Sequence, residues 1–97
     1  MKHFSITQGK GFKMTFANGW TASVQFGAGN YSDNYAAPFP TSSEFQNNCG
    51  AMGSDTAEIA AWDQSGVWHS FGHDTVKGYC TPNEAAEFIA MVANKKD

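Results

Sequence analysis

The chain has 97 residues, six lysines, no arginine and a formal net charge of −3. This length allows one domain, residues 1–97, and the weakly acidic balance excludes the basic surface that direct nucleic-acid binding needs. No apolar run of membrane-spanning length lies near Met1, so we expect no signal peptide, no membrane segment and a cytoplasmic location.

The chain also lacks leucine. Its core must therefore be built from aromatic rings and from Ala, Val and Ile, a composition that suits a β-sheet better than a helical bundle. Because a core of this kind is small, we expect self-association through a sheet face or edge, giving a homodimer.

The first elements are predicted to be strands, because apolar and polar residues alternate with a period of two. Phe4 and Ile6 mark a short strand, and residues 12–16 and 20–26 mark a β-hairpin. Asn18-Gly19 favours a two-residue turn, but that register places apolar and polar side chains on the same face. A three-residue loop over 17–19, with Gly19 in the left-handed conformation, restores one apolar face. The cross-strand pairs are then Phe16–Trp20, Met14–Ala22 and Phe12–Val24.

A long central loop is expected from residue 27 to residue 55, where neither period is sustained. Gly27 to Asn30 follows a strand as a phosphate-binding turn does, but no helix follows it, so a tight turn or bulge is the better interpretation. Aromatic residues recur in the loop, which predicts an ordered segment packed over a sheet face, with a helical turn over 42–47. These aromatics are Tyr31, Tyr35, Phe39 and Phe45.

A second hairpin is predicted over residues 56–62 and 67–71, with Asp63 opening and Gly66 closing its turn. One register places Trp62 opposite Trp68 and Ile59 opposite Phe71.

The chain then predicts a helix from about Pro82 to Asn94. Thr81 is the expected N-cap, and Glu84 completes a capping box. The apolar stripe that must dock on the sheet consists of Ala85, Phe88, Ile89 and Val92. The expected fold is therefore α+β: an antiparallel sheet of four to five strands with one C-terminal helix and a long central loop.

The sequence contains no motif that indicates a catalytic site or a metal site. His69, His73, Cys49 and Cys80 include zinc-ligand types, but their spacing matches no zinc motif, so we expect no metal site. Cys80 with His69 or His73 and Asp74 has the residue types of a nucleophilic site, and its position before a helix would lower the pKa of its thiol. No motif fixes that geometry, so we expect neither an enzyme nor a cofactor, and two unpaired cysteines.

Aromatic side chains provide the stronger indication of function, because Tyr and Trp are favoured where a protein meets a partner. The alternative is that these rings only cover the sheet as part of the core. The candidate binding residues are Tyr31, Tyr35, Phe39, Asn30 and Trp68.

The segments NGWTASVQFGAGNYSDN, AEIAAWDQSGVWHSF and GYCTPNEAAEFI resemble small proteins encoded in bacteriophage and prophage genomes, which generally have no assigned function. The resemblance spans most of the chain and transfers no functional residue. It implies a role in host takeover or against host defences, in the host cytoplasm, by binding a host protein or by sequestering a nucleotide signal.

Three hypotheses for function follow. The first is a non-enzymatic, phage-type accessory protein that blocks a host macromolecule through the loop over 27–55. The second is a sponge for a small nucleotide, which would have to hold phosphate without arginine, through Lys10, Lys13 or Lys77 and backbone amides. The third is a minor structural component of the virion.

Overall fold

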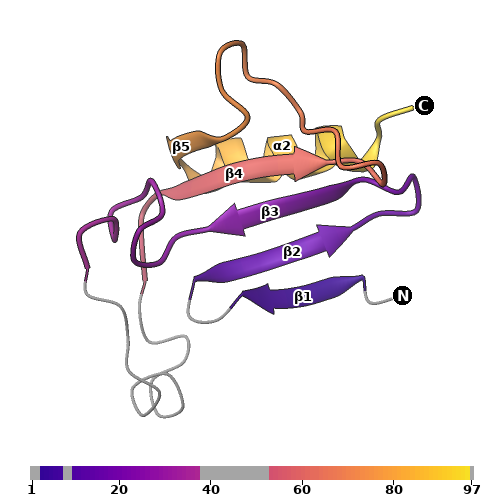
Figure 1. The fold of residues 1–97 in the computed structure, drawn as a ribbon. Helices are drawn as coiled ribbons and strands as arrows, with labels where there is room; N and C mark the ends of the chain where they lie inside the picture. The colour runs from indigo at the N-terminus through magenta and orange to yellow at the C-terminus, as the bar shows by residue number, and fades with distance from the viewer. Residues whose placement is uncertain (1–2, 8–9, 38–52, 97) are drawn as a thin grey trace.

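A computed structural model describes residues 3–7, 10–37 and 53–96. Five strands form one antiparallel sheet in the order β1-β2-β3-β4-β5, so each strand pairs with its neighbours in sequence (Figure 1). The strands are β1 (Phe4–Thr7), β2 (Gly11–Thr15), β3 (Thr21–Gln25), β4 (Ala57–Trp62) and β5 (Lys77–Cys80), and the helix is α2 (Pro82–Ala93). The predicted α+β fold is confirmed.

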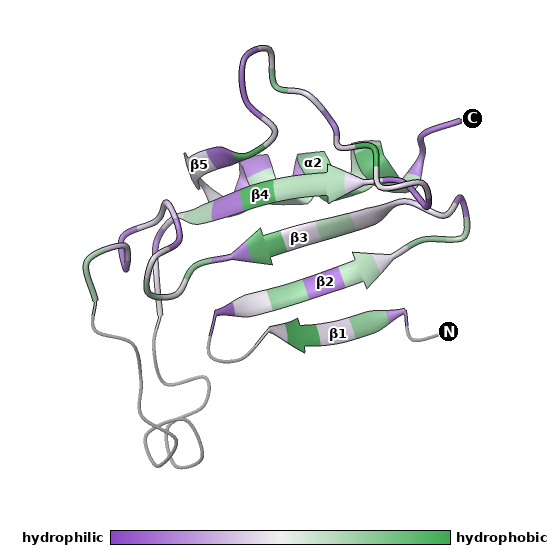
Figure 2. Ribbon diagram, viewed as in Figure 1, coloured by the Kyte–Doolittle hydropathy of each residue, from purple (hydrophilic) through white to green (hydrophobic). Residues whose placement is uncertain are grey.

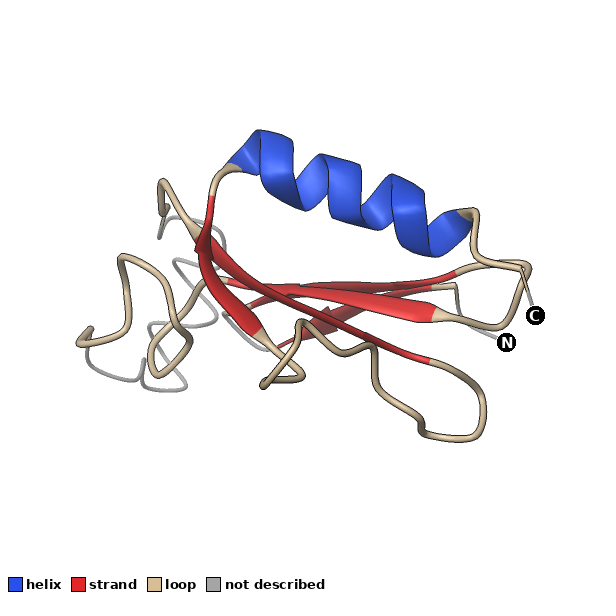
Figure 3. Ribbon diagram, turned by 90° about the horizontal axis from the view of Figure 1, so that it is seen from above, coloured by secondary structure: helices blue, strands red, loops and turns tan. Residues whose placement is uncertain are grey.

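The fold has two layers, with α2 on one side of the sheet (Figure 3). The helix contacts β3, β4 and β5. Its Ala85, Phe88 and Val92 are buried against Val24 and Ile59 of the sheet, as the predicted stripe requires. In the described part of the chain, no helix is long and apolar enough to cross a membrane.

The first hairpin has the predicted register. Phe12 pairs with Val24 and Met14 with Ala22, and the amide of Phe16 donates to the carbonyl of Trp20. Gly19 adopts φ 87°, which a residue with a side chain rarely adopts. Burial of one apolar face therefore set the register, although the two central turn residues alone favour a shorter loop.

The second hairpin is only partly as predicted. Trp62 does pair with Trp68, and the amide of His69 donates to the carbonyl of Ala61. Beyond this point residues 67–71 do not continue as a strand, and Ile59 lies opposite Lys77 instead of Phe71. The prediction of a strand over 67–71 was therefore wrong, and β5 is the strand that it missed.

Packing of the Phe71 ring accounts for this departure. The ring lies 5.3 Å from the ring of Phe88 and 4.9 Å from that of His69, and it is partly buried against the core. A turn follows at once, because the amide of Phe71 donates to the carbonyl of Asp74 and Gly72 adopts φ 101°. Packing an aromatic ring against Phe88 of the helix outweighs extending a strand.

The helix begins and ends with specific hydrogen bonds. The Thr81 hydroxyl accepts from the amide of Glu84, and the Glu84 carboxylate accepts from the amide of Thr81, so the predicted capping box is confirmed. At the other end the side-chain amide of Asn18, in the turn of the first hairpin, donates to the carbonyls of Val92 and Lys95.

Candidate functional site

The candidate site is built on the described ends of the central loop, residues 27–37 and 53–56. Gly27 to Asn30 form the predicted tight turn: the Asn30 amide donates to the carbonyl of Gly27, and the Asn30 side-chain oxygen accepts from the amide of Gly27. Gly29 has φ 81°. Asn30 therefore shapes the turn, and its side-chain oxygen is occupied there.

Polar side chains join the two ends of the loop. The Asp33 carboxylate accepts from the hydroxyl of Thr56 at 2.8 Å and from the amide of Asp55 at 3.2 Å. The Asn34 side-chain amide donates to the carbonyls of Phe26 and Gly53 at 2.8 and 2.9 Å. The loop is thus anchored to the ends of β3 and β4 by side chains that bridge distant parts of the sequence.

Tyr31 and Tyr35 emerge from this frame as a stacked pair. Their ring centroids lie 5.4 Å apart with planes at 9°, and the side chains are 47% and 50% exposed. The backbone of Tyr31 is fixed on both sides: its amide donates to the Glu58 carboxylate of β4, and its carbonyl accepts from the amide of Tyr79 in β5. The pair is therefore held in place through hydrogen bonds of the Tyr31 backbone, and about half of each side chain is exposed to a partner.

Tyr79 is the third tyrosine of the chain and is also exposed. It adopts φ 55°, which costs about 1–3 kcal/mol for a residue other than glycine. Its neighbour Gly78 has no room for a side chain, because a β-carbon there would collide with the β-carbon of Tyr31. The contact of β5 with residue 31 thus brings Tyr31, Tyr35 and Tyr79 to one end of the sheet, which we call the tyrosine surface.

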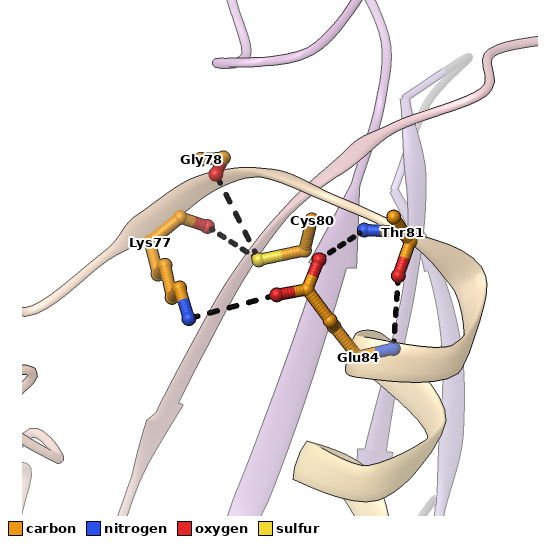
Figure 4. A network of polar contacts seen from close by, with 5 residues as sticks. All are labelled: Lys77, Gly78, Cys80, Thr81 and Glu84. Carbon is orange, nitrogen blue, oxygen red and sulfur yellow. Dashed lines mark hydrogen bonds and ion pairs between the residues drawn. The ribbon is translucent and has the colours of Figure 1, made fainter.

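The carboxylates around the tyrosine surface are Asp33, Asp55 and Glu58, which come from the loop and from β4. On β5, Lys77 lies 3.8 Å from the carboxylate of Glu84 (Figure 4). The carboxylates of Asp33, Asp55 and Glu58 favour a cationic or neutral partner over a phosphate.

The other predicted binding residues lie elsewhere. Trp68 is 45% exposed, but its ring packs 4.7 Å from that of Trp62 at the far end of β4. Glu58, beside the tyrosines, and Trp62 are four residues apart, about 13 Å along a strand. The structure therefore does not bring Trp68 to the tyrosine surface. Phe39 lies outside the described residues, as do Phe45, Cys49 and the helical turn predicted over 42–47.

Cys80 does not have the environment of a nucleophile. The side chain is buried, and its thiol lies 3.6 and 3.7 Å from the carbonyls of Lys77 and Gly78 (Figure 4). Burial raises the pKa of the Cys80 thiol, and Lys77 only partly opposes this effect. The prediction that the helix start lowers this pKa was wrong, because desolvation of the thiolate is the larger influence.

The histidines form no cluster with Cys80 that could hold a metal. Within the described residues, no three His, Cys, Asp or Glu side chains are close enough together to bind a metal ion. His69 instead packs edge-on against Phe88, with ring centroids 5.5 Å apart. Burial and the charge of Lys95 lower the pKa of His69.

Sequence reasoning identified Tyr31 and Tyr35 but missed Tyr79, Gly78 and Glu58. These three residues belong to the site because β5 lies beside the loop, and β5 itself is a four-residue strand with little alternation of buried and exposed residues.

Comparison of the chain with known protein families, with curated proteins and with solved structures finds no match.

Proposed function

We propose that the protein is a non-enzymatic binding protein that docks on a host macromolecule, a host protein in the first instance, and blocks it. The tyrosine surface is the contact region. The observation that carries this proposal is the stacked, half-exposed Tyr31–Tyr35 pair on a hydrogen-bonded frame. Rigid aromatic side chains offer contact area at low entropic cost, which is why they dominate binding hot spots. The phage-type role rests on the resemblance described above.

Charge favours a macromolecule over a small nucleotide. A base could stack on an open tyrosine face, but its phosphates would then lie near Asp33, Asp55 and Glu58. A protein partner that presents lysine or arginine would instead meet both the carboxylates and the aromatic faces, and each favours a cation.

The test is the double substitution Tyr31→Ala/Tyr35→Ala. Capture of proteins from host lysate by the wild type should identify a partner, and purified partner should then bind the double variant at least about 30-fold more weakly, since hot-spot truncation costs about 2 kcal/mol or more. The melting temperature should stay close to that of the wild type because both rings are half exposed. Trp68→Ala removes an equally exposed aromatic at the far end of β4 and should leave binding unchanged.

Two results would contradict the proposal. If the double variant loses about 3–5 kcal/mol of stability, the rings act as core residues. If it folds and binds like the wild type while Trp68→Ala does not bind, the contact region lies on the second hairpin. Mass spectrometry of small molecules released on heating the purified protein tests the nucleotide alternative directly.

A further inference from the structure

The free edge of the sheet is β1. In the part of the chain that the structure describes, β1 pairs only with β2, and the amide of Thr15 donates to the carbonyl of His3. Antiparallel pairing alternates between hydrogen-bonded and non-hydrogen-bonded pairs, so residues 3, 5 and 7 direct their backbone groups toward β2. The N–H and C=O groups of Phe4 and Ile6 therefore point outward.

The side chains of these same two residues are exposed. Phe4 is 72% exposed and Ile6 81%, although both lie on the face of the sheet that α2 covers farther along. The helix contacts β3, β4 and β5, and Figure 2 shows the hydrophobic residues of β1 lying beyond its reach. Phe12, paired with Ile6, continues this apolar strip onto β2.

The edge is held in place and left unprotected. Gly11 lies between Thr7 and Gln25 in the pairing, and the side-chain amide of Gln25 donates across it to the hydroxyl of Thr7 at 3.0 Å. This bond fixes β1 to β3. Edge strands are usually protected by lysine, proline or a bulge, and the sequence FSIT of β1 contains neither residue. The opposite edge, β5, is bonded to the Tyr31 backbone.

We propose that β1 is the dimerisation edge, where a second copy of this chain pairs antiparallel around a two-fold axis at Ser5. In that register Phe4 exchanges two backbone hydrogen bonds with the partner's Ile6, and Ile6 does the same with the partner's Phe4. The four apolar side chains then lie together on one face, and the two sheets become one. The register satisfies every outward-facing backbone group of Phe4 and Ile6 at once, which is why the edge, and not the face, is the surface assigned.

The apolar area that two copies can bury at this edge sets the expected affinity of the dimer. At about 200 Å² for a large apolar side chain, the exposed parts of Phe4, Ile6 and Phe12 amount to roughly 400 Å² per protomer. With the strand backbone added, two copies come close to the lower end of specific interfaces, about 1,200 Å². The dimer should therefore dissociate on dilution.

Cysteine cross-linking tests the register. Ser5 and the partner's Ser5 form a non-hydrogen-bonded pair with Cα atoms about 4.5 Å apart, which is within disulfide range. Ser5→Cys should therefore give a covalent dimer of twice the 10.5 kDa chain mass on mild oxidation, beyond any given by the wild type with its native cysteines. Thr7→Cys is the matched control: the two residues lie about 13 Å apart across the axis and should not cross-link.

Proline substitution tests the edge itself. Ile6→Pro removes an outward N–H, so light scattering should find a folded monomer at concentrations where the wild type is a dimer. Ser5→Pro removes an N–H that bonds to β2 and should lower the melting temperature instead. The proposal is overturned if the wild type stays monomeric at every concentration, if Ile6→Pro remains dimeric, or if Thr7→Cys cross-links as readily as Ser5→Cys. If Ile6→Pro unfolds, the Ser5→Cys result alone decides.

Discussion

At the scale of single residues, Asn18 has the most consequential contacts. Its side-chain amide lies 2.9 Å from the carbonyl oxygen of Val92, 3.3 Å from that of Ala93 and 3.0 Å from that of Lys95. Its side-chain oxygen accepts from the amide of Trp20. The last carbonyls of a helix have no partner within the helix, and here a hairpin turn supplies one. Asn18 thus determines both the shape of the turn and the position of the helix end.

The substitution Asn18→Ala should destabilise the protein by about 1–3 kcal/mol, because it removes the side-chain donor that the partly buried carbonyls of Ala93 and Lys95 have in the hairpin turn, while Val92 keeps the backbone amide of Lys95 as a donor. Denaturant unfolding measures this change. Asn83→Ala, at an exposed position in the first turn of the same helix, should change stability by no more than about 0.5 kcal/mol. Equal effects of the two substitutions would show that the hydrogen bonds of Asn18 to the end of the helix contribute nothing to stability.

His69 predicts a pH dependence. Burial and the nearby Lys95 lower its pKa from the ordinary value of 6.5, so the folded protein binds this proton less tightly than the unfolded chain. The contribution that neutral His69 makes to the free energy of unfolding is fully present above the ordinary pKa. It is lost as the pH falls through the lowered pKa of the folded state. Denaturant unfolding from about pH 7 to about pH 5 should show a smaller loss of stability for His69→Asn than for the wild type. Parallel curves for the two proteins would contradict this assignment.

At the scale of elements, the capping box at the start of α2 is a separable contribution to stability. Thr81→Ala removes the hydroxyl that accepts from the amide of Glu84 and should cost about 0.5–2 kcal/mol. Thermal unfolding measures the loss. Thr75→Ala, at an exposed position in the segment before β5, is the control and should melt with the wild type. A Thr81→Ala melting temperature equal to that of the control would mean that the remaining interactions fix the helix start.

The elements differ in how far the sequence predicts them. The first hairpin and the helix were predicted with their register and cap because each carries its own local signal: alternation, Gly19, and the Thr81–Glu84 box. The position of β5 follows instead from the packing of Phe71 on Phe88, a contact between distant segments that no local pattern encodes. For short apolar runs, tertiary packing overrides propensity.

The candidate site shows the same division. Tyr31 and Tyr35 were identified from composition, because aromatic residues in a loop rich in glycine and asparagine are unusual. Tyr79 could not be added, because its place beside Tyr31 depends on where β5 lies. Its positive φ is invisible in the sequence, although Gly78 beside it is a weak indication of a close approach of two backbones.

At the scale of the whole molecule, a thin core makes the protein sensitive to a single residue. Phe88 is 6% exposed and joins the sheet, the helix and residues 69–71. Phe88→Ala should cost about 3–5 kcal/mol, a large part of the 5–15 kcal/mol that typically stabilises a domain. Circular dichroism with denaturant unfolding should show a largely unfolded or strongly destabilised variant.

Met91→Ala is the control for Phe88→Ala, because it shortens an exposed apolar side chain of the same helix and should change stability little. Comparable losses in the two variants would mean that helix propensity, and not core packing, sets the stability.

The contact between residue 18 and residues 92–95 also bears on how the protein forms in the cell. During synthesis β1, β2 and β3 emerge from the ribosome well before α2, yet α2 supplies the side chains that cover Val24 and Ile59. The early strands therefore have no layer to pack on while translation continues. We expect folding to be one late event that follows synthesis of the helix, and the nascent strands to rely until then on chaperones or on rapid translation to avoid aggregation.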